Sequence, residues 1–296
     1  RDEVIGPYEL NSIYCGECSA MMSALPDNCI DLTVTSPPYD NLRTYNGYTF
    51  DFEPIARQLY RVTKPGGVVM WVVGDATVNG SETGTSFRQA LGFMEVGFKL
   101  HDTMIWEKIN FIPLTHNRYE QCFEYMFILS KFFVKTFNGT MENSKTLEYR
   151  NHLQANKYTR HKKFQDSSVK DNNKVVEIKP NKLHRNIFEY GTGKGRTTEY
   201  TKGMVKFEAP FPESLARDHI ISRSNPGDVV LDPLMGSGTV GKMCVLLDRN
   251  FLGFEISQEY VDLANRRIAQ VVAQPKLLSF QTETAHSSYG NSGTSK

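Results

Sequence analysis

The sequence predicts an α/β protein whose central sheet is doubly wound, with helices on both of its faces. Apolar runs of strand length alternate with segments of helical periodicity along most of the 296 residues. The run at 68–73 is continuously apolar, which is typical of a central parallel strand buried on both faces. A glycine turn at 236–238 separates a short apolar run from a helical pattern, which predicts a strand–turn–helix unit.

The predicted strands are short segments rich in apolar residues, and they occupy 13–15, 30–35, 68–73, 100–106, 124–130, 229–232 and 251–255. A first helical pattern follows 13–15 and ends at Leu25-Pro26. The other predicted helices have apolar residues at intervals of three and four, and they occupy 52–63, 87–96, 240–248 and 258–272. Two of them have clear stop signals: the segment 64–67, which contains one proline and two glycines, and Gly97.

The composition indicates a packed globular protein. Hydrophobic residues make up 40% of the chain and aromatic residues 11%. No uninterrupted apolar stretch approaches the roughly 18 residues that a membrane helix needs, and no signal peptide is visible. Five cysteines, an odd number without a framework spacing, favour a reducing compartment. Cys15 and Cys18 form one isolated pair, so no metal site is expected.

The charge is unevenly distributed along the chain. Residues 151–206 contain 13 Lys or Arg and 5 Asp or Glu, a net charge of +8, while the whole chain has a net charge of only +1. Aromatic and histidine residues are interleaved with these charges. Such a segment indicates a polyanionic partner, although a solvated loop would have a similar composition.

The glycine turn has the features of a nucleotide-type cofactor loop. Asp232 ends a predicted strand, Gly236 and Gly238 allow a close approach of the backbone to a ligand, and a helix begins near Thr239. Glu255 ends the next predicted strand about 20 residues beyond the glycines, the offset at which an acid reaches ribose hydroxyls.

A second loop, Ser36-Pro37-Pro38-Tyr39, directly follows the strand predicted at 30–35. In isolation, such a tetrapeptide is more often a surface turn or a proline-rich docking motif. Its position after a buried strand, together with the glycine loop downstream, favours a functional loop.

The two loops together resemble the catalytic and cofactor loops of the amino-methylating DNA methyltransferases, and their order resembles the permuted, beta-type members. The resemblance implies a circularly permuted, Rossmann-like sheet with S-adenosyl-L-methionine as cofactor and double-stranded DNA as substrate. It also implies that 131–206 is an inserted, basic target-recognition region.

The resemblance assigns roles to individual residues. Ser36 and the Pro37 carbonyl accept hydrogen bonds from the target amine, Pro38 stiffens the loop, and Tyr39 stacks on a base that has left the helix. The expected cofactor contacts are Asp232, Pro233, Gly236, Gly238, Thr239 and Glu255, with Phe211 and Glu17 from other segments. The expected substrate contacts are Asp75, Arg160, Lys162 and Lys163. Asp75 is equally compatible with a cap on the next helix.

Serine at the head of the catalytic loop favours the N4 amine of cytosine as the methyl acceptor. Methylation of adenine N6 is the alternative within the same family. A module that retains the fold and binds DNA without catalysis is the alternative of another class. No Pro-Cys pair occurs in the chain, although carbon-5 cytosine enzymes would need one.

We expect residues 1–272 to form the catalytic domain and the polar segment 273–296 to be a flexible tail or linker. A start at Arg1 rather than Met suggests a domain taken from a longer protein with a targeting module, and an ordinary terminus is the alternative. The expected location is the cytoplasm for a bacterial or phage source and the nucleus for a eukaryotic one. The sequence does not distinguish a monomer from a dimer.

Overall fold

A computed structural model describes residues 3–38, 50–110, 118–143, 181–192 and 212–273. Its centre is an eight-stranded sheet. In spatial order the strands are β12 (Ile187–Tyr190), β8 (Lys99–Lys108), β9 (Phe123–Ser130), β5 (Thr63–Val73), β4 (Ile30–Thr35), β13 (Val229–Asp232), β14 (Asn250–Glu255) and β3 (Ser12–Cys15). Strands that are adjacent in the sheet are therefore often distant in the chain, as a permuted fold requires.

Strand β9 is antiparallel to both of its neighbours, whereas the other adjacent strands are parallel. A parallel return needs a crossover, usually a helix, and the sequence between β8 and β9 has no helical pattern. The two strands instead pair as antiparallel neighbours, and beside them the amide of Lys108 donates to the carbonyl of Cys122. The predicted doubly wound sheet is therefore confirmed, and one of its strands, β9, runs in the opposite direction to the others.

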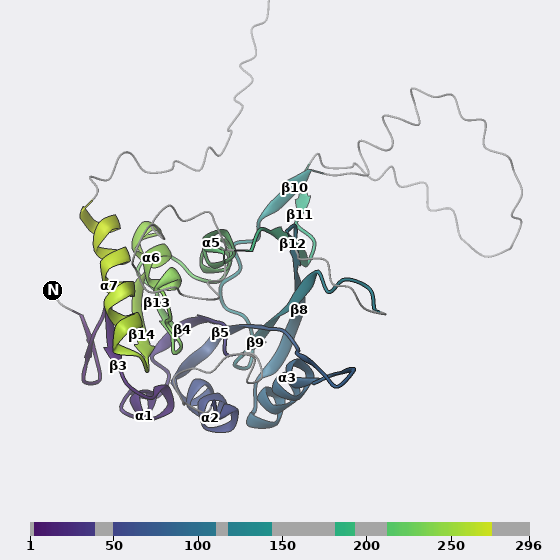
Figure 1. Cartoon of the computed structure of the whole chain (residues 1–296). Coiled ribbons are helices and arrows are strands. Elements are labelled where there is room, and N and C mark those ends of the chain that lie inside the picture. Colours follow the sequence, from purple (N-terminus) through teal and green to yellow (C-terminus); the bar gives the residue numbers. More distant parts are fainter. Residues whose placement is uncertain (1–2, 39–49, 111–117, 144–180, 193–211, 274–296) are drawn as a thin grey trace, which may run out of the picture.

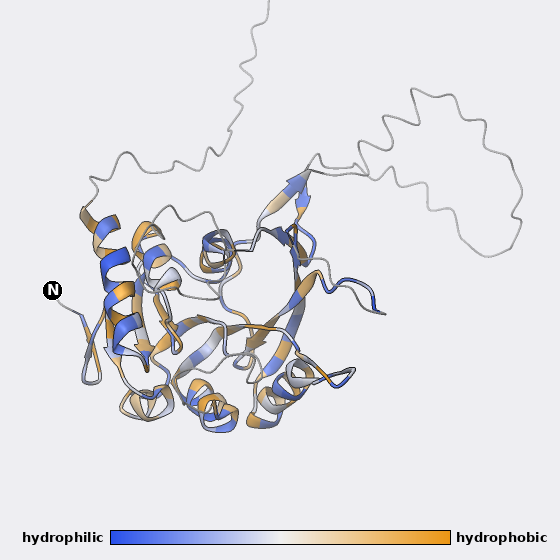
Figure 2. Ribbon diagram, viewed as in Figure 1, coloured by the Kyte–Doolittle hydropathy of each residue, from blue (hydrophilic) through white to orange (hydrophobic). Residues whose placement is uncertain are grey.

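Helices cover both faces of the sheet (Figure 1). On one face lie α1 (Cys18–Ser23), α2 (Phe52–Val62) and α3 (Thr85–Val96), and on the other α5 (Glu213–Arg223), α6 (Thr239–Leu246) and α7 (Gln258–Ala273). The helices carry both polar and apolar residues, as expected for helices with one side against a sheet (Figure 2).

Strand β5 shows how the sheet separates two hydrophobic cores. Its side chains point alternately to opposite faces. Val68, Met70 and Val72 belong to the core beneath α5, α6 and α7, whereas Trp71 and Val73 belong to the core beneath α1, α2 and α3. All of these side chains are buried, so the predicted burial of this strand on both faces is confirmed.

The predicted strands and helices are all present, with ends that differ by a few residues. Helix α2 ends at Val62, just before the predicted stop at 64–67, and this segment also belongs to the start of β5. Helix α5 and strand β12 were not predicted, and β12 lies inside the range 131–206 yet pairs with β8 in the main sheet. The other unpredicted elements are short antiparallel pairs: β1 (Val4–Ile5) with β2 (Tyr8–Glu9), β6 (Thr77–Val78) with β7 (Ser81–Glu82), and β10 (Met141–Asn143) with β11 (Asn181–Leu183). Among the described helices, none is long and apolar enough to cross a membrane.

Candidate active site

The two loops singled out in the sequence begin at the carboxyl ends of neighbouring parallel strands. Residues 36–38 follow β4, and the glycine loop follows β13, which pairs with β4 through Val230–Leu32 and Leu231–Thr33. The strand order reverses at this point of the sheet. The chain continues from β4 to β5 on one side and from β13 to β14 on the other. In open α/β sheets, ligands bind at the carboxyl edge of such a switch point.

A buried hydrogen bond joins the residues at which the two loops begin. The hydroxyl of Thr35, the last residue of β4, donates to Oδ1 of Asp232, the last residue of β13, at 2.7 Å. The same oxygen accepts the amide of Leu234 at 3.1 Å. Thr35 is fully buried and Asp232 is 2% exposed. Residues that are 197 positions apart in the chain are thus held in direct contact.

The carboxyl group of Asp232 titrates far from its ordinary range. Burial raises the pKa of Asp232 to about 7, the hydrogen bonds from Thr35 and Leu234 lower it, and the nearby charge of Glu255 raises it. Desolvation is therefore the dominant effect, as expected for an acid in the interior of a sheet.

Glu255 holds the glycine loop from the next strand. Its Oε2 accepts the amide of Gly236 at 2.8 Å, and its Oε1 accepts the amide of Ser257 at 3.0 Å. Burial raises the pKa of Glu255, whereas these amide bonds lower it. Each carboxylate oxygen can accept two hydrogen bonds, so Glu255 retains capacity for hydroxyl donors of a ligand.

The glycine loop leads into α6 without a side-chain cap. The N-cap residue Gly238 has a φ of +80°, and no side chain accepts from the first turn there. The amide groups at this end are therefore suited to a ligand carboxylate. An added Cβ at Gly238 would lie 2.7 Å from Cβ of Ala264 on α7, so this glycine also permits close packing between the loop and a helix.

Charged side chains on α5, α6 and α7 that were not predicted as site residues support the glycine loop. Arg267 on α7 lies 2.8 Å from Oγ of Ser237 in the loop and 3.0 Å from Oε1 of Glu213. Lys242 on α6 also contacts Glu213, at 2.8 Å. This Arg267 network links α5, α6 and α7 to the loop. The signal in the sequence was a charged residue at helical spacing within an apolar stripe, because Arg267 follows the buried Ala264 by three positions.

Two predicted site residues are engaged in helix capping. The carboxylate of Glu17 accepts the amides of Ser19 and Ala20 at the start of α1. Partial burial raises the pKa of Glu17, but these hydrogen bonds outweigh it and hold the pKa below its ordinary value. Glu17 lies close to the cofactor loop in the fold, because the amide of the preceding Gly16 donates to the carbonyl of Glu255.

Asp75 follows β5 and accepts the amide and hydroxyl of Ser86 near the start of α3. It also accepts the hydroxyl of Thr83, at 3.3 Å. Asp75 was expected either to contact the substrate or to cap a helix, and its contacts in the structure are those of a helix cap.

Several predicted residues lie outside the described part of the chain: Tyr39, Arg160, Lys162, Lys163 and Phe211. Within the described residues, no cluster of three His, Cys, Asp or Glu side chains could hold a metal ion. Burial raises the pKa of the Cys18 thiol, which keeps it protonated.

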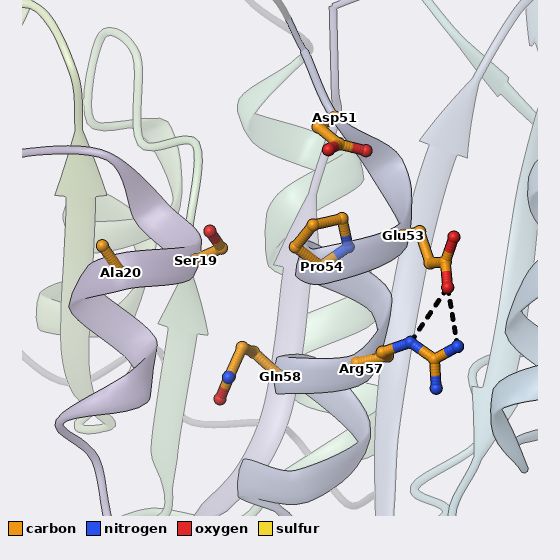
Figure 3. A pocket seen from close by; sticks show the side chains of 7 residues that line it. All are labelled: Ser19, Ala20, Asp51, Glu53, Pro54, Arg57 and Gln58. Atoms are coloured by element: carbon orange, nitrogen blue, oxygen red, sulfur yellow. Dashed lines mark hydrogen bonds and ion pairs between the residues drawn. The ribbon is translucent and has the colours of Figure 1, made fainter.

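A hollow of about 390 Å³ lies between α1 and α2, and Ser19, Pro54 and Gln58 are among the residues that line it (Figure 3). Glu53 and Arg57 in its wall pair with each other across one helical turn, at 2.6 Å. The hollow contains none of the predicted site residues, and we assign it no role in the chemistry.

Comparisons with known proteins agree with this geometry. The sequence profile of a family described as DNA methylase matches residues 30–266. The orphan methyltransferase M.BamHII of Bacillus amyloliquefaciens is 49% identical over 253 residues, which cover 85% of this chain and 93% of that protein.

Solved structures share the fold at lower identity. The PvuII DNA methyltransferase, described as cytosine-N4-specific, is 19% identical with a TM-score of 0.64, over 90% of this chain and 88% of that one. The complex of M1.HpyAVI with S-adenosylmethionine is 23% identical with a TM-score of 0.55, over 86% of this chain and 98% of that one.

Proposed function

Since this chain belongs to the DNA methylase family whose profile it matches, we propose that it transfers a methyl group from S-adenosyl-L-methionine to the N4 amine of cytosine in double-stranded DNA. The coarser activity, methylation of DNA at an exocyclic amine, is that of the family. One observation carries the assignment of the site: the hydrogen bond from Thr35 to Asp232 holds the catalytic and cofactor loops side by side at the switch point of the sheet.

S-adenosyl-L-methionine is the cofactor of this family, and the residues around the glycine loop fit it. The uncapped start of α6 suits the methionine carboxylate, and Glu255 suits the ribose hydroxyls. The bound cofactor supplies an electrophilic methyl group. We assign Asp232, Pro233, Gly236, Gly238 and Thr239 to the walls of this site. Glu17 and Phe211 complete the proposed set.

The catalytic loop activates the amine by accepting hydrogen bonds. The lone pair of an exocyclic amine is delocalised into the ring, so the nitrogen is a weak nucleophile. Ser36 Oγ and the Pro37 carbonyl accept hydrogen bonds from the two N–H groups of this amine. These bonds favour a tetrahedral nitrogen and stabilise the positive charge that develops on it. Pro37 and Pro38 restrict the backbone, and Tyr39 presents an aromatic face to the base.

Contacts with DNA are assigned to the basic segment. Arg160, Lys162 and Lys163 are proposed to neutralise phosphates, which makes affinity dependent on salt but not on sequence. Asp75, with its carboxylate held at the start of α3, is proposed as part of the wall of the base pocket.

The choice of cytosine rests on Ser36, whose neutral hydroxyl suffices to accept a hydrogen bond from the cytosine amine. The described specificity of the PvuII enzyme supports it by analogy. The test is mass analysis of nucleosides from unmodified duplex DNA incubated with the protein and S-adenosyl-L-methionine, with Ser36→Ala as the control.

N4-methylcytosine is the expected product. N6-methyladenine alone would overturn the base assignment and keep the reaction. Cofactor binding with no methylated nucleoside on a broad mixture of DNA sequences would favour the DNA-binding module.

A further inference from the structure

Strand β4 contains two buried threonines on the same face, and among the described residues only one of them has a hydrogen-bond partner for its hydroxyl. Thr33 and Thr35 are both fully buried and are separated by one residue, so their side chains point the same way. The hydroxyl of Thr35 donates to Asp232 at 2.7 Å. The hydroxyl of Thr33 has no hydrogen-bond partner in the part of the chain that the structure describes. Burial of a hydroxyl without a hydrogen-bond partner costs free energy. The two buried threonines therefore differ in one respect, the hydrogen bond that Thr35 makes to Asp232.

The Thr35–Asp232 bond lies where the two strands separate. The register of β4 with β13 ends at the pair Leu231–Thr33. Beyond that pair, Thr35 directly precedes Ser36, and Asp232 anchors the cofactor loop through the amide of Leu234. The bond therefore connects the residue before the catalytic serine to the first turn of the cofactor loop.

We propose that Thr35 is a positioning residue for methyl transfer, whose hydroxyl sets the distance between the catalytic loop and the cofactor loop. The proposal rests on the function proposed above. Direct transfer requires the amine and the methyl group to meet within a narrow range of distance and angle, and a displacement of about 1 Å can cost roughly 100-fold in rate. The cofactor loop has other support besides this bond, because Glu255 and the Arg267 network also hold it.

The experiment compares Thr35→Val with Thr33→Val, which make the same change on the same face of the same strand. Thr35→Val should lower kcat by roughly 10-fold or more, because losing the bond lets the two loops shift relative to each other and misaligns the amine and the methyl group. The KM for S-adenosyl-L-methionine should change less than about 3-fold, because the contacts with the cofactor remain. Thr33→Val should retain the kcat of the wild type, and Thr35→Ser, which keeps the hydroxyl, should restore most of the activity.

The pH profile gives a readout that a purely structural role would not move. Glu255 on β14 raises the pKa of Asp232, while Thr35 and Leu234 lower it, and Cys244 on α6 is buried and electrostatically coupled to Asp232. Removing the Thr35 hydroxyl therefore raises the pKa of Asp232. The ionised carboxylate is the stronger acceptor of the Leu234 amide, so the acidic limb of kcat should move to higher pH in Thr35→Val and stay in place in Thr33→Val.

Equal kcat values and equal pH profiles for Thr35→Val and Thr33→Val would overturn the proposal. So would a loss in Thr35→Val that appears only as a lower melting temperature. A wild-type protein that methylates no DNA in the same assay would instead count against the proposed function.

Discussion

Replacing Arg267 with Met should destabilise the protein and weaken binding of the cofactor, because Arg267 fastens the glycine loop to two helices. Its guanidinium is within hydrogen-bond distance of Ser237 in the loop and of Glu213 at the start of α5, and the residue is 6% exposed. Methionine preserves the length and apolar contacts of the side chain, so the change removes mainly the charge and its hydrogen bonds.

The magnitude follows from what each partner retains. Glu213 is partly exposed and keeps Lys242 at 2.8 Å, so its carboxylate remains paired. Ser237 is buried and loses the hydrogen bond to Arg267. With about 1.5–3 kcal/mol for a hydrogen bond to a charged group and a smaller loss at Glu213, the free energy of unfolding should fall by about 3 kcal/mol. For a domain of this size, that corresponds to a melting temperature lower by about 6–12 °C.

The assay pairs thermal unfolding with calorimetric titration of S-adenosyl-L-methionine. Kd should rise roughly tenfold if loosening the loop costs about 1.4 kcal/mol of binding. Arg266→Met is the matched control, because Arg266 is the exposed neighbour on the same helix and the same charge is lost. If Arg267→Met and Arg266→Met have the same melting temperature and the same Kd for S-adenosyl-L-methionine, the Arg267 network does not support the loop and the reasoning is refuted.

Three further predictions concern the catalytic loop, the basic segment and Asp232. Ser36→Ala should lower turnover by roughly 100-fold through lost stabilisation of the reacting amine, and an unchanged kcat would remove Ser36 from the mechanism. Joint replacement of Arg160, Lys162 and Lys163 by Ala should reduce the slope of log K against log salt by about 2–3, with the affinity for the cofactor unchanged, and an unaltered slope would move the DNA contacts elsewhere. Burial raises the pKa of Asp232 to about 7, so the folded protein keeps a proton that the unfolded chain releases at pH of about 4. The free energy of unfolding should therefore fall as pH rises between these values, and Asp232→Asn should flatten this dependence in urea titrations; equal slopes for the two proteins would contradict the assignment.

The elements that position the loops could be predicted from the sequence because their signals are local. In strand β4 apolar residues alternate with Asp and Thr, and Ser36 and two prolines follow it, whereas β13 is a short apolar segment followed by a glycine turn. Helix α5 was missed because its buried face includes His219 and Arg223, which interrupt the apolar stripe. Burial and the charge of Arg223 lower the pKa of His219 to about 3, so the imidazole is neutral and behaves as a core residue. An isolated sequence gives no sign of such a role.

Contacts within the site could be predicted only in part. The motifs indicated one catalytic and one cofactor loop, each after a predicted strand, and the carboxyl ends of parallel strands share one edge of a sheet. The Thr35–Asp232 bond depends on the register of two strands that lie 197 residues apart, and no local pattern encodes that register. The support from Arg267 likewise depends on how α7 packs against the loop. Glu17 and Asp75 illustrate a further limit, because a carboxylate before a helix is equally suited to a cap and to a ligand.

The order of strands in the sheet determines when the protein becomes competent during its synthesis. β3 and β4 are synthesised close together in time, yet in the sheet β14 and β13 lie between them, and these two strands are synthesised much later than β4. Until then β3 lacks the neighbour with which it pairs in the sheet, and Thr35 lacks Asp232. Pairings between such distant segments form slowly. A nascent chain on the ribosome therefore has the loop after β4 before it has the glycine loop that we propose as the site of the methyl donor, and we expect chains that end before β13 to leave DNA unmodified.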